Sequence, residues 1–288
     1  MKKIVVITGA NGLIGNRLCQ EFVRRGWQVR AGVRRPGEYA ATHPDVTPFQ
    51  CALPDSLDQT AFDGADVCIH AAYATRATTR ERARRVNEDG TLAVLSASRR
   101  AAVYFVFISS CSAHEAARSD YGRSKLALEK KIDLQRDLVL RPGLVLGKQG
   151  LFGRMVDSIR RSRLIPIFDG GRQSVQTIHI ADLCAAIVRA VERRLTGRLI
   201  LAEAESICMR DLLAAIAQKL GKRAIFISVP ATPALVALRV AEGLRLPLPV
   251  SSDNLLGLRS MVYQDPTADL ARLGISLRSA RQSLDDLL

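Results

Sequence analysis

The first half of the chain alternates short apolar runs with longer segments whose apolar residues recur every three or four positions. Short runs bounded by polar or turn residues predict strands, and the longer spacing predicts amphipathic helices. The expected strands cover residues 3–8, 28–33, about 45–50, 66–70, 103–109 and 137–141. Strands that alternate with helices in this way predict an α/β fold with a doubly wound parallel sheet.

After residue 141 the alternation becomes less regular. We expect helices over 151–162, 181–193 and 209–220, a strand over 198–202, a Pro/Gly-rich turn over 166–171, and mostly helical segments over 233–244 and 252–260. This change of pattern predicts two domains. Residues 1–150 would hold the sheet, and residues 151–288 a smaller lobe whose chain partly returns to it.

A glycine-rich turn follows the first expected strand directly. Gly9 permits a tight turn, Gly12 lets the backbone approach a pyrophosphate, and Gly15 allows the following helix to pack closely on the strand. A helix that begins near Gly12 would direct its unpaired N–H groups at the phosphates. The turn therefore predicts that residues 1–150 bind a dinucleotide.

A tyrosine and a lysine lie four residues apart at the start of an expected helix. Tyr121 and Lys125 therefore share one helix face. A phenol with an ordinary pKa of about 10 exchanges protons poorly near neutral pH, but an adjacent cation lowers that pKa. The pair is a candidate general acid/base.

The chain resembles the extended short-chain dehydrogenase/reductase family, also called the NAD-dependent epimerase/dehydratase family. The resemblance rests on ordered segments, namely Thr8–Gly15, Asp66–Ala72, Val86–Thr91, Ser109–Ser110, Tyr121–Lys125, Arg141–Gly143 and Ile178–Asp182. These segments cover residues 1–182, and the remaining residues are less similar. The resemblance implies a Rossmann-type sheet with a smaller C-terminal substrate lobe.

The resemblance also implies roles for individual residues. Tyr121 would be the catalytic acid/base, Lys125 would lower its pKa and hold the cofactor ribose, and Ser110 would hold the substrate oxygen, with Ser109 as the competing serine. The cofactor-binding residues would be Gly9, Asn11, Gly12, Leu13, Ile14, Gly15, Arg34, Arg35, Ala71, Ala72, Asn87, Tyr121, Lys125 and Pro142.

The end of the second expected strand bears on the choice of cofactor. NAD enzymes of this type place an acid there to accept ribose hydroxyls, whereas arginine suits a 2′-phosphate. This chain has Arg34 and Arg35, with no acid before Glu38. We therefore expect NADP(H), with NAD(H) as the alternative. The family often has an acid after the third strand to contact adenine, and the segment Cys51–Leu53 has none.

Two departures from the family pattern bear on the substrate. Sugar-nucleotide enzymes of the family often have an arginine three residues before the Ile-His pair, to bind the diphosphate, and this chain has Val175. Arg172 or Arg154 could replace it. Ten residues separate Ser110 from Tyr121, fewer than is usual in those enzymes, which predicts a more open pocket or a smaller substrate.

The net charge of +14 raises the question of nucleic-acid binding. The arginines are spread along expected helix ends and polar faces, without a basic tail or an aromatic-interleaved platform. We favour a solvated basic surface. The apolar run Pro233–Gly243 is compatible with a membrane surface, but we favour a helix that faces the core of the lobe.

The remaining composition predicts a cytoplasmic enzyme. The chain enters a core strand within three residues, no apolar stretch is long enough to span a membrane, and six scattered cysteines suggest reduced thiols. We expect no metal, no nucleic acid, and a small-molecule substrate such as a sugar nucleotide, and we leave a homodimer open.

These observations predict an oxidoreductase that transfers hydride between NADP(H) and a carbonyl/alcohol carbon. One alternative is a nucleoside-diphosphate-sugar epimerase or 4-keto-sugar reductase with the same chemistry. Another alternative is a non-catalytic dinucleotide-binding subunit or sensor, which retention of Tyr121 and Lys125 disfavours.

Overall fold

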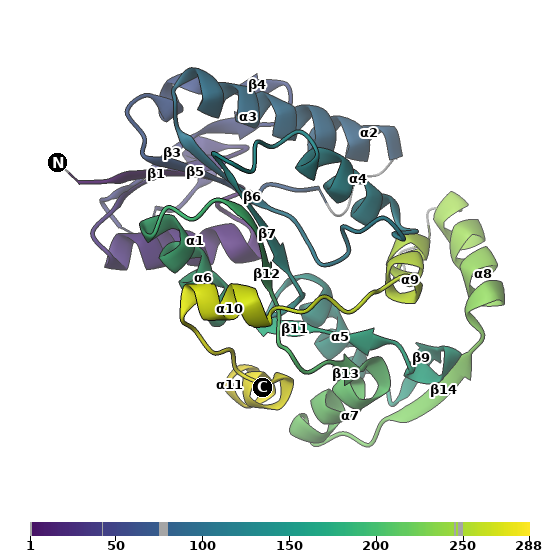
Figure 1. Cartoon of the computed structure of the whole chain (residues 1–288). Coiled ribbons are helices and arrows are strands. Elements are labelled where there is room, and N and C mark those ends of the chain that lie inside the picture. Colours follow the sequence, from purple (N-terminus) through teal and green to yellow (C-terminus); the bar gives the residue numbers. More distant parts are fainter. Residues whose placement is uncertain (1, 42, 75–79, 245, 247–249) are drawn as a thin grey trace. The chain divides into compact units, whose positions relative to one another are not determined.

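The computed structural model describes residues 2–41, 43–74, 80–244, 246 and 250–288 (Figure 1). The chain forms two compact units. The first comprises Met1–Ser109, Ala127–Leu140 and Cys184–Leu199, and the second comprises Ser110–Leu126, Arg141–Leu183 and Ile200–Leu288. Because the chain passes from one unit to the other several times, the units are not divided at a single point such as residue 150.

One large sheet has the strand order β12-β7-β6-β5-β1-β2-β3-β4. Its strands are β1 (Ile4–Thr8), β2 (Gln28–Val33), β3 (Val46–Ala52), β4 (Ser56–Leu57), β5 (Val67–His70), β6 (Tyr104–Ile108), β7 (Leu138–Pro142) and β12 (Gly197–Leu201). The pairs from β3 through β2, β1, β5 and β6 to β7 are parallel, and β4 is antiparallel to β3. The predicted α/β fold with a Rossmann-type parallel sheet is confirmed.

Helices cover both faces of this sheet in the first unit, and Figure 1 shows α1 and α3 on opposite sides of it. The helical elements are α1 (Leu13–Arg24), η1 (Pro36–Glu38), η2 (Gln59–Phe62), α2 (Arg80–Arg84), the π-helical η3 (Arg85–Asp89), α3 (Gly90–Arg100) and α6 (Ile180–Glu192). Strands covered on both faces read as continuous apolar runs. Accordingly every residue of β5 and β6 is buried, including Phe105 and Phe107.

The second unit contains short strand pairs and several helices. Its strands are β8 (Leu144–Leu146), β9 (Leu164–Phe168), β10 (Ser174–Val175), β11 (Thr177–His179), β13 (Ile207–Cys208) and β14 (Ile225–Val229). Its helices are α4 (Asp120–Glu129), which the two units share, α5 (Gly150–Arg161), η4 (Asp169–Gly171), α7 (Met209–Lys219), α8 (Ala231–Gly243), α9 (Ser252–Arg259), α10 (Thr267–Leu273) and α11 (Ala280–Leu287).

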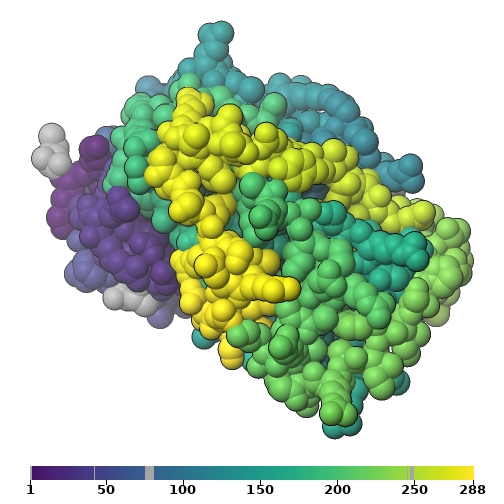
Figure 2. Space-filling view, turned by 60° about the horizontal axis from the view of Figure 1, so that its bottom comes forward, coloured from purple at the N-terminus to yellow at the C-terminus, as the bar shows by residue number. Residues whose placement is uncertain are grey.

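The core of this unit joins helices that are distant in sequence. Phe152 of α5, Leu212 of α7 and Leu284 of α11 belong to one buried cluster. In Figure 2 the yellow C-terminal segment lies beside the green segment that contains α7. Among the helices of the described ranges, none combines the length and apolar character needed to cross a membrane.

Two expected elements differ from the structure. The turn expected over 166–171 is the end of strand β9 followed by η4. Ile165 and Ile167 are buried while Pro166 is exposed, so this segment follows the two-residue period of a strand paired with β14. Helix α8 was expected to face the core of the lobe, and its inner side does pack in a buried cluster with Ala231, Ala234 and Leu255, but its opposite side is exposed.

Candidate active site

The glycine turn has the shape that a pyrophosphate site requires. Gly9 has a φ of +70°, and a Cβ there would lie 2.8 Å from the backbone of Ala72. A Cβ on Gly15 would lie 2.2 Å from the Gly9 carbonyl oxygen, so the first turn of α1 packs directly on the loop. Asn11 and Gly12 are exposed, and no side chain caps α1. The first N–H groups of α1, which have no acceptor within the helix, and this close-packed backbone fit a dinucleotide.

A buried hydrogen-bond chain supports the neighbouring loop after β5. His70 joins Thr8 of β1, at 2.7 Å, to Thr91 of α3, at 2.9 Å. The Asn87 side chain accepts from the Ala74 N–H at 2.6 Å and donates to the Ala74 carbonyl at 3.2 Å. Asn87 therefore holds the backbone of this loop, which also contains Ala71 and Ala72. Sequence reasoning missed the role of His70, because a strand-end histidine has no distinctive pattern.

The two arginines after β2 are both exposed but differ in their contacts. Arg35 forms an ion pair with Glu38 at 3.1 Å. Within the described ranges the guanidinium of Arg34 has no ion pair. The backbone carbonyl oxygen of Arg34 accepts a hydrogen bond from Gln50 Nε2. Arg34 is thus the more available cation, because Glu38 competes for Arg35.

Tyr121 and Lys125 lie in the first half of α4, as the sequence predicts. Tyr121 is the second residue of the helix and is half-buried. Lys125 is only 3% exposed. Lysine is rarely buried to this extent without a polar partner, and Lys125 does take part in a polar interaction inside the structure.

The hydroxyl of Ser110 forms a hydrogen bond with the phenol of Tyr121. Ser110 Oγ also accepts from the Ser112 N–H at 3.1 Å, which fixes the start of the loop. The buried competitor Ser109 instead donates to Glu129, which also accepts from Arg198. The structure therefore brings together Ser110 and Tyr121, whereas Ser109 serves a buried polar network.

The environment of Tyr121 raises its pKa above the ordinary value of 10. Burial is the main cause, the Ser110 hydrogen bond opposes it, and the nearby Cys111 thiol adds to it. This direction differs from the lowering expected from Lys125, because desolvation of the phenolate outweighs the effects that favour it. The phenol is therefore protonated at neutral pH and can donate a proton.

Gly122 explains how the short loop after Ser110 reaches the helix. A Cβ at this position would lie 2.4 Å from the Ser112 carbonyl oxygen and 3.1 Å from Ser119 Oγ. Glycine thus allows the loop backbone to rest directly on α4. The loop between Ser110 and Tyr121 therefore packs against Gly122, the residue that follows Tyr121.

Asp253 of α9 is a site residue that sequence reasoning missed. Its carboxylate accepts from the Asp120 N–H at 2.6 Å and from the Tyr121 N–H at 3.3 Å. Nearby, the Arg118 N–H donates to Ser260 Oγ at 3.2 Å. A carboxylate at a helix N-terminus satisfies unpaired N–H groups. Asp253 lies 133 and 132 positions after Asp120 and Tyr121, so no local pattern could reveal this cap.

We expect Asp253→Asn to lower kcat by about tenfold, since one of its two acceptor oxygens becomes an NH₂ group that faces an N–H donor. Burial raises the pKa of Asp253, so the ionised carboxylate costs stability at neutral pH. The neutral amide removes that cost, and we expect a small change in the free energy of unfolding.

Steady-state kinetics and denaturant unfolding would check both expectations. The matched control is Asp58→Asn, which makes the same exchange at the N-cap of η2 in the first unit. A large decrease in the free energy of unfolding with unchanged kcat would show that Asp253 serves folding alone.

A second polar network holds the backbone that directly follows Ser110. Gln264 donates to the carbonyl of Cys111 and accepts from Arg141 at 3.1 Å. Its backbone N–H donates to Gln176 Oε1 at 2.9 Å. The carbonyl of the buried Pro142 accepts from the Cys111 N–H at 2.9 Å. Pro142, expected at the cofactor, thus fixes the backbone that follows Ser110.

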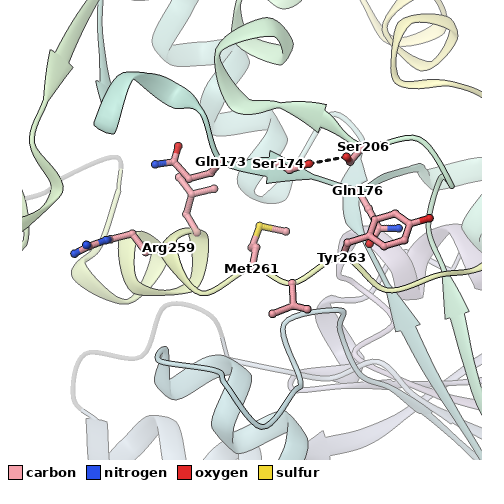
Figure 3. A pocket seen from close by; sticks show the side chains of 9 residues that line it. Gln173, Ser174, Gln176, Ser206, Arg259, Met261 and Tyr263 are labelled. Carbon is pink, nitrogen blue, oxygen red and sulfur yellow. Dashed lines mark hydrogen bonds between the residues drawn. The ribbon is translucent and has the colours of Figure 1, made fainter.

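The position where the family often has an arginine is a core residue in this chain. Val175 is 1% exposed and belongs to the apolar cluster of the second unit. The residues before and after it, Ser174 and Gln176, line a hollow of about 180 Å³ (Figure 3). Its lining comprises Gln173, Ser174, Gln176, Ser206, Leu258, Arg259, Met261, Val262 and Tyr263. The one cation in this lining is Arg259, from the C-terminal part of the chain.

Comparison with known proteins places these features in a family. The sequence profile of the NAD dependent epimerase/dehydratase family matches residues 5–202. The solved structure of MoeE5 in complex with UDP-glucuronic acid and NAD has a TM-score of 0.75 and 20% identity, and the match covers 98% of this chain and 97% of that one. This structural neighbour binds a sugar nucleotide and a nicotinamide dinucleotide.

Two curated relatives carry reductase names. Ceramide reductase from Caulobacter vibrioides (strain NA1000 / CB15N) is 33% identical over 64% of this chain and 60% of its own length. The 4-hydroxy-2-methyl-3-oxo-4-farnesyl-3,4-dihydroquinoline-1-oxide ketoreductase of Stigmatella aurantiaca is 28% identical over 83% of this chain and 79% of its own length. The match thus spans less than two thirds of the first relative.

Proposed function

The chain belongs to the NAD-dependent epimerase/dehydratase family, and we propose that within it this protein is an NADP(H)-dependent ketoreductase. The observation that carries the proposal is the hydrogen bond between Ser110 and Tyr121, two hydroxyl groups that can serve one substrate oxygen. The names of the two relatives support reduction as the net reaction.

The reaction requires one hydride and one proton. The dinucleotide supplies the hydride when bound. Tyr121 donates its phenolic proton to the carbonyl oxygen, and the Ser110 hydroxyl donates a hydrogen bond to the same oxygen as negative charge develops. The ketone thereby becomes an alcohol, and solvent reprotonates the phenolate. Lys125 favours that phenolate electrostatically.

We propose a ketone carried on an apolar molecule as the substrate class. Both relatives are named for substrates with long apolar parts, a ceramide and a farnesyl quinoline. The buried Val175 supports the same conclusion, because it leaves no arginine at that position for a diphosphate. The second candidate is a sugar-nucleotide epimerase or 4-keto-sugar reductase, favoured by Arg259 in the hollow of the second unit.

An assay of NADPH oxidation would test the proposal. The purified protein would receive a long-chain β-keto amide, a small cyclic ketone, UDP-glucose or a 4-keto sugar nucleotide. We expect turnover with the β-keto amide. Interconversion of UDP-hexoses without net change in the dinucleotide would overturn net reduction, and exclusive use of the 4-keto sugar would overturn the apolar substrate class.

We expect Lys125→Met to lower alcohol oxidation and to move its rise to higher pH. Burial already raises the pKa of Tyr121, and loss of a nearby cation raises it further, so less phenolate is present at any given pH. The pH–rate profile measures this shift. Lys131→Met, at an exposed position of the first unit, is the control. An unchanged profile would mean that Lys125 does not act on the phenol.

A further inference from the structure

Strands β9 and β14 form a two-stranded ribbon whose outer face is apolar. In their parallel register Leu164 pairs with Ile225 and Pro166 pairs with Ile227. All four are exposed, with Leu164, Ile225 and Ile227 at 53%, 57% and 46%. The intervening Ile165 is buried in the core. Single exposed apolar residues are common, but four neighbours in register on one face form a patch.

A group of cations lies where the two strands of this ribbon begin. The group comprises Arg161, Arg163, Lys222 and Arg223, all exposed, and the Arg163 carbonyl accepts from the Ile225 N–H at 2.7 Å. Across the described parts of the chain, no acidic side chain forms an ion pair with any of the four. The segments 161–168 and 222–229 contain no acid. We refer to these four residues as the basic collar.

Helix α8 adds a second apolar surface at the other end of the ribbon. It follows β14 after Pro230 (Figure 1). Val236 and Val240 of α8 are 60% and 58% exposed, and Leu244, directly after the helix, is 68% exposed. The inner side packs with Phe168 and Val229, the last residues of the two strands. The ribbon and α8 therefore each expose an apolar surface.

We propose that the outer face of the β9–β14 ribbon, together with the basic collar, docks on an anionic lipid bilayer. Apolar side chains gain free energy in the interfacial region of a bilayer, and cations beside them are attracted to anionic headgroups. The collar provides charge complementarity to such a surface, and the net charge of +14 adds a long-range attraction. The exposed side of α8 would add contacts at the rim.

Vesicle co-sedimentation tests the proposal. We expect the wild-type protein to bind vesicles of phosphatidylcholine with phosphatidylglycerol, and to bind phosphatidylcholine alone far less. Ile225→Ser with Ile227→Ser should weaken this binding about tenfold, because the serines remove apolar surface from the contact. Arg163→Glu with Arg223→Glu should weaken it more, since each cation near such a surface contributes about fivefold.

Two controls, one double variant and one single variant, separate a specific docking surface from the effects of total charge and of any exposed apolar residue. Arg100→Glu with Lys131→Glu makes the same change in net charge at exposed positions of the first unit, and Leu92→Ser removes an exposed apolar side chain there. Both should bind nearly as wild type. Reduction of a water-soluble ketone should be unchanged in the Ile225/Ile227 pair, which shows that the variant is folded.

Three outcomes would overturn the proposal. One is failure of the wild-type protein to bind anionic vesicles. Another is an equal loss of binding in the Arg100/Lys131 control, which would mean that total charge alone is responsible. The third is a sedimentation-velocity result in which the wild-type protein is a dimer and the Ile225→Ser, Ile227→Ser variant is a monomer. That result would mean that the ribbon face binds a second copy of the chain.

Discussion

Replacing Tyr121 with phenylalanine is expected to reduce turnover by about 10²- to 10⁴-fold, the usual effect of removing a positioned acid/base. The variant lacks the hydroxyl that bonds with Ser110 but keeps the ring and the helix. Because the glycine turn is untouched, binding of NADPH should stay within a few-fold of wild type. Single-turnover kinetics and a fluorescence titration of NADPH would measure both quantities.

Retention of more than half the activity in this variant would falsify the assignment of Tyr121. A parallel loss of NADPH binding would mean that the hydroxyl of Tyr121 serves cofactor binding and not proton transfer alone. Ser110→Ala is the companion variant. It removes the other hydroxyl and should cost less, because the proton donor remains.

Replacing Arg34 with aspartate and Arg35 with alanine is expected to reverse the cofactor preference. A hydrogen bond to a charged group contributes about 1.5–3 kcal/mol, which corresponds to roughly 10- to 100-fold in affinity for each arginine on a 2′-phosphate. NADPH should therefore bind far more weakly, while NADH should change little or improve through the new acid. Titrations of both cofactors at low and moderate salt measure the effect, and screening should shrink the wild-type preference.

The single variants make this prediction sharper. Because Arg35 already forms an ion pair with Glu38, Arg34→Ala should weaken NADPH binding more than Arg35→Ala does. Glu38→Gln should strengthen NADPH binding by releasing Arg35. If wild-type protein binds NADPH and NADH equally and the double variant changes neither, the arginines are surface charge and the preference for NADP(H) is wrong.

The local parts of the fold follow from the sequence, because strands and helices depend on the spacing of apolar residues. The strands from β1 to β7 that form the parallel sheet were expected at nearly the observed positions. The glycine turn was equally readable, because Gly9, Gly12 and Gly15 lie within a few residues between an apolar run and a helical pattern. Tyr121 and Lys125 could be paired because four residues make one helix face.

Contacts between distant segments could not be read in this way. Buried and exposed residues alternate along β9. This segment forms a strand because β14, some 60 residues later, pairs with it. The choice between Ser109 and Ser110 depends on which hydroxyl meets Glu129 and which meets Tyr121. The direction of the Tyr121 pKa likewise depends on burial, which no spacing along the chain reveals.

Apolar periodicity and glycine positions thus determine the individual strands of the sheet, the glycine turn and the acid/base candidate from the sequence alone, because each depends on residues a few positions apart. Tertiary packing decides that Asp253 caps the helix of Tyr121 and that Val175 enters the core. It also decides that one face of the β9–β14 ribbon stays outside. These outcomes depend on which surfaces meet after the chain has folded, since hydrogen bonding and burial act between neighbours in space.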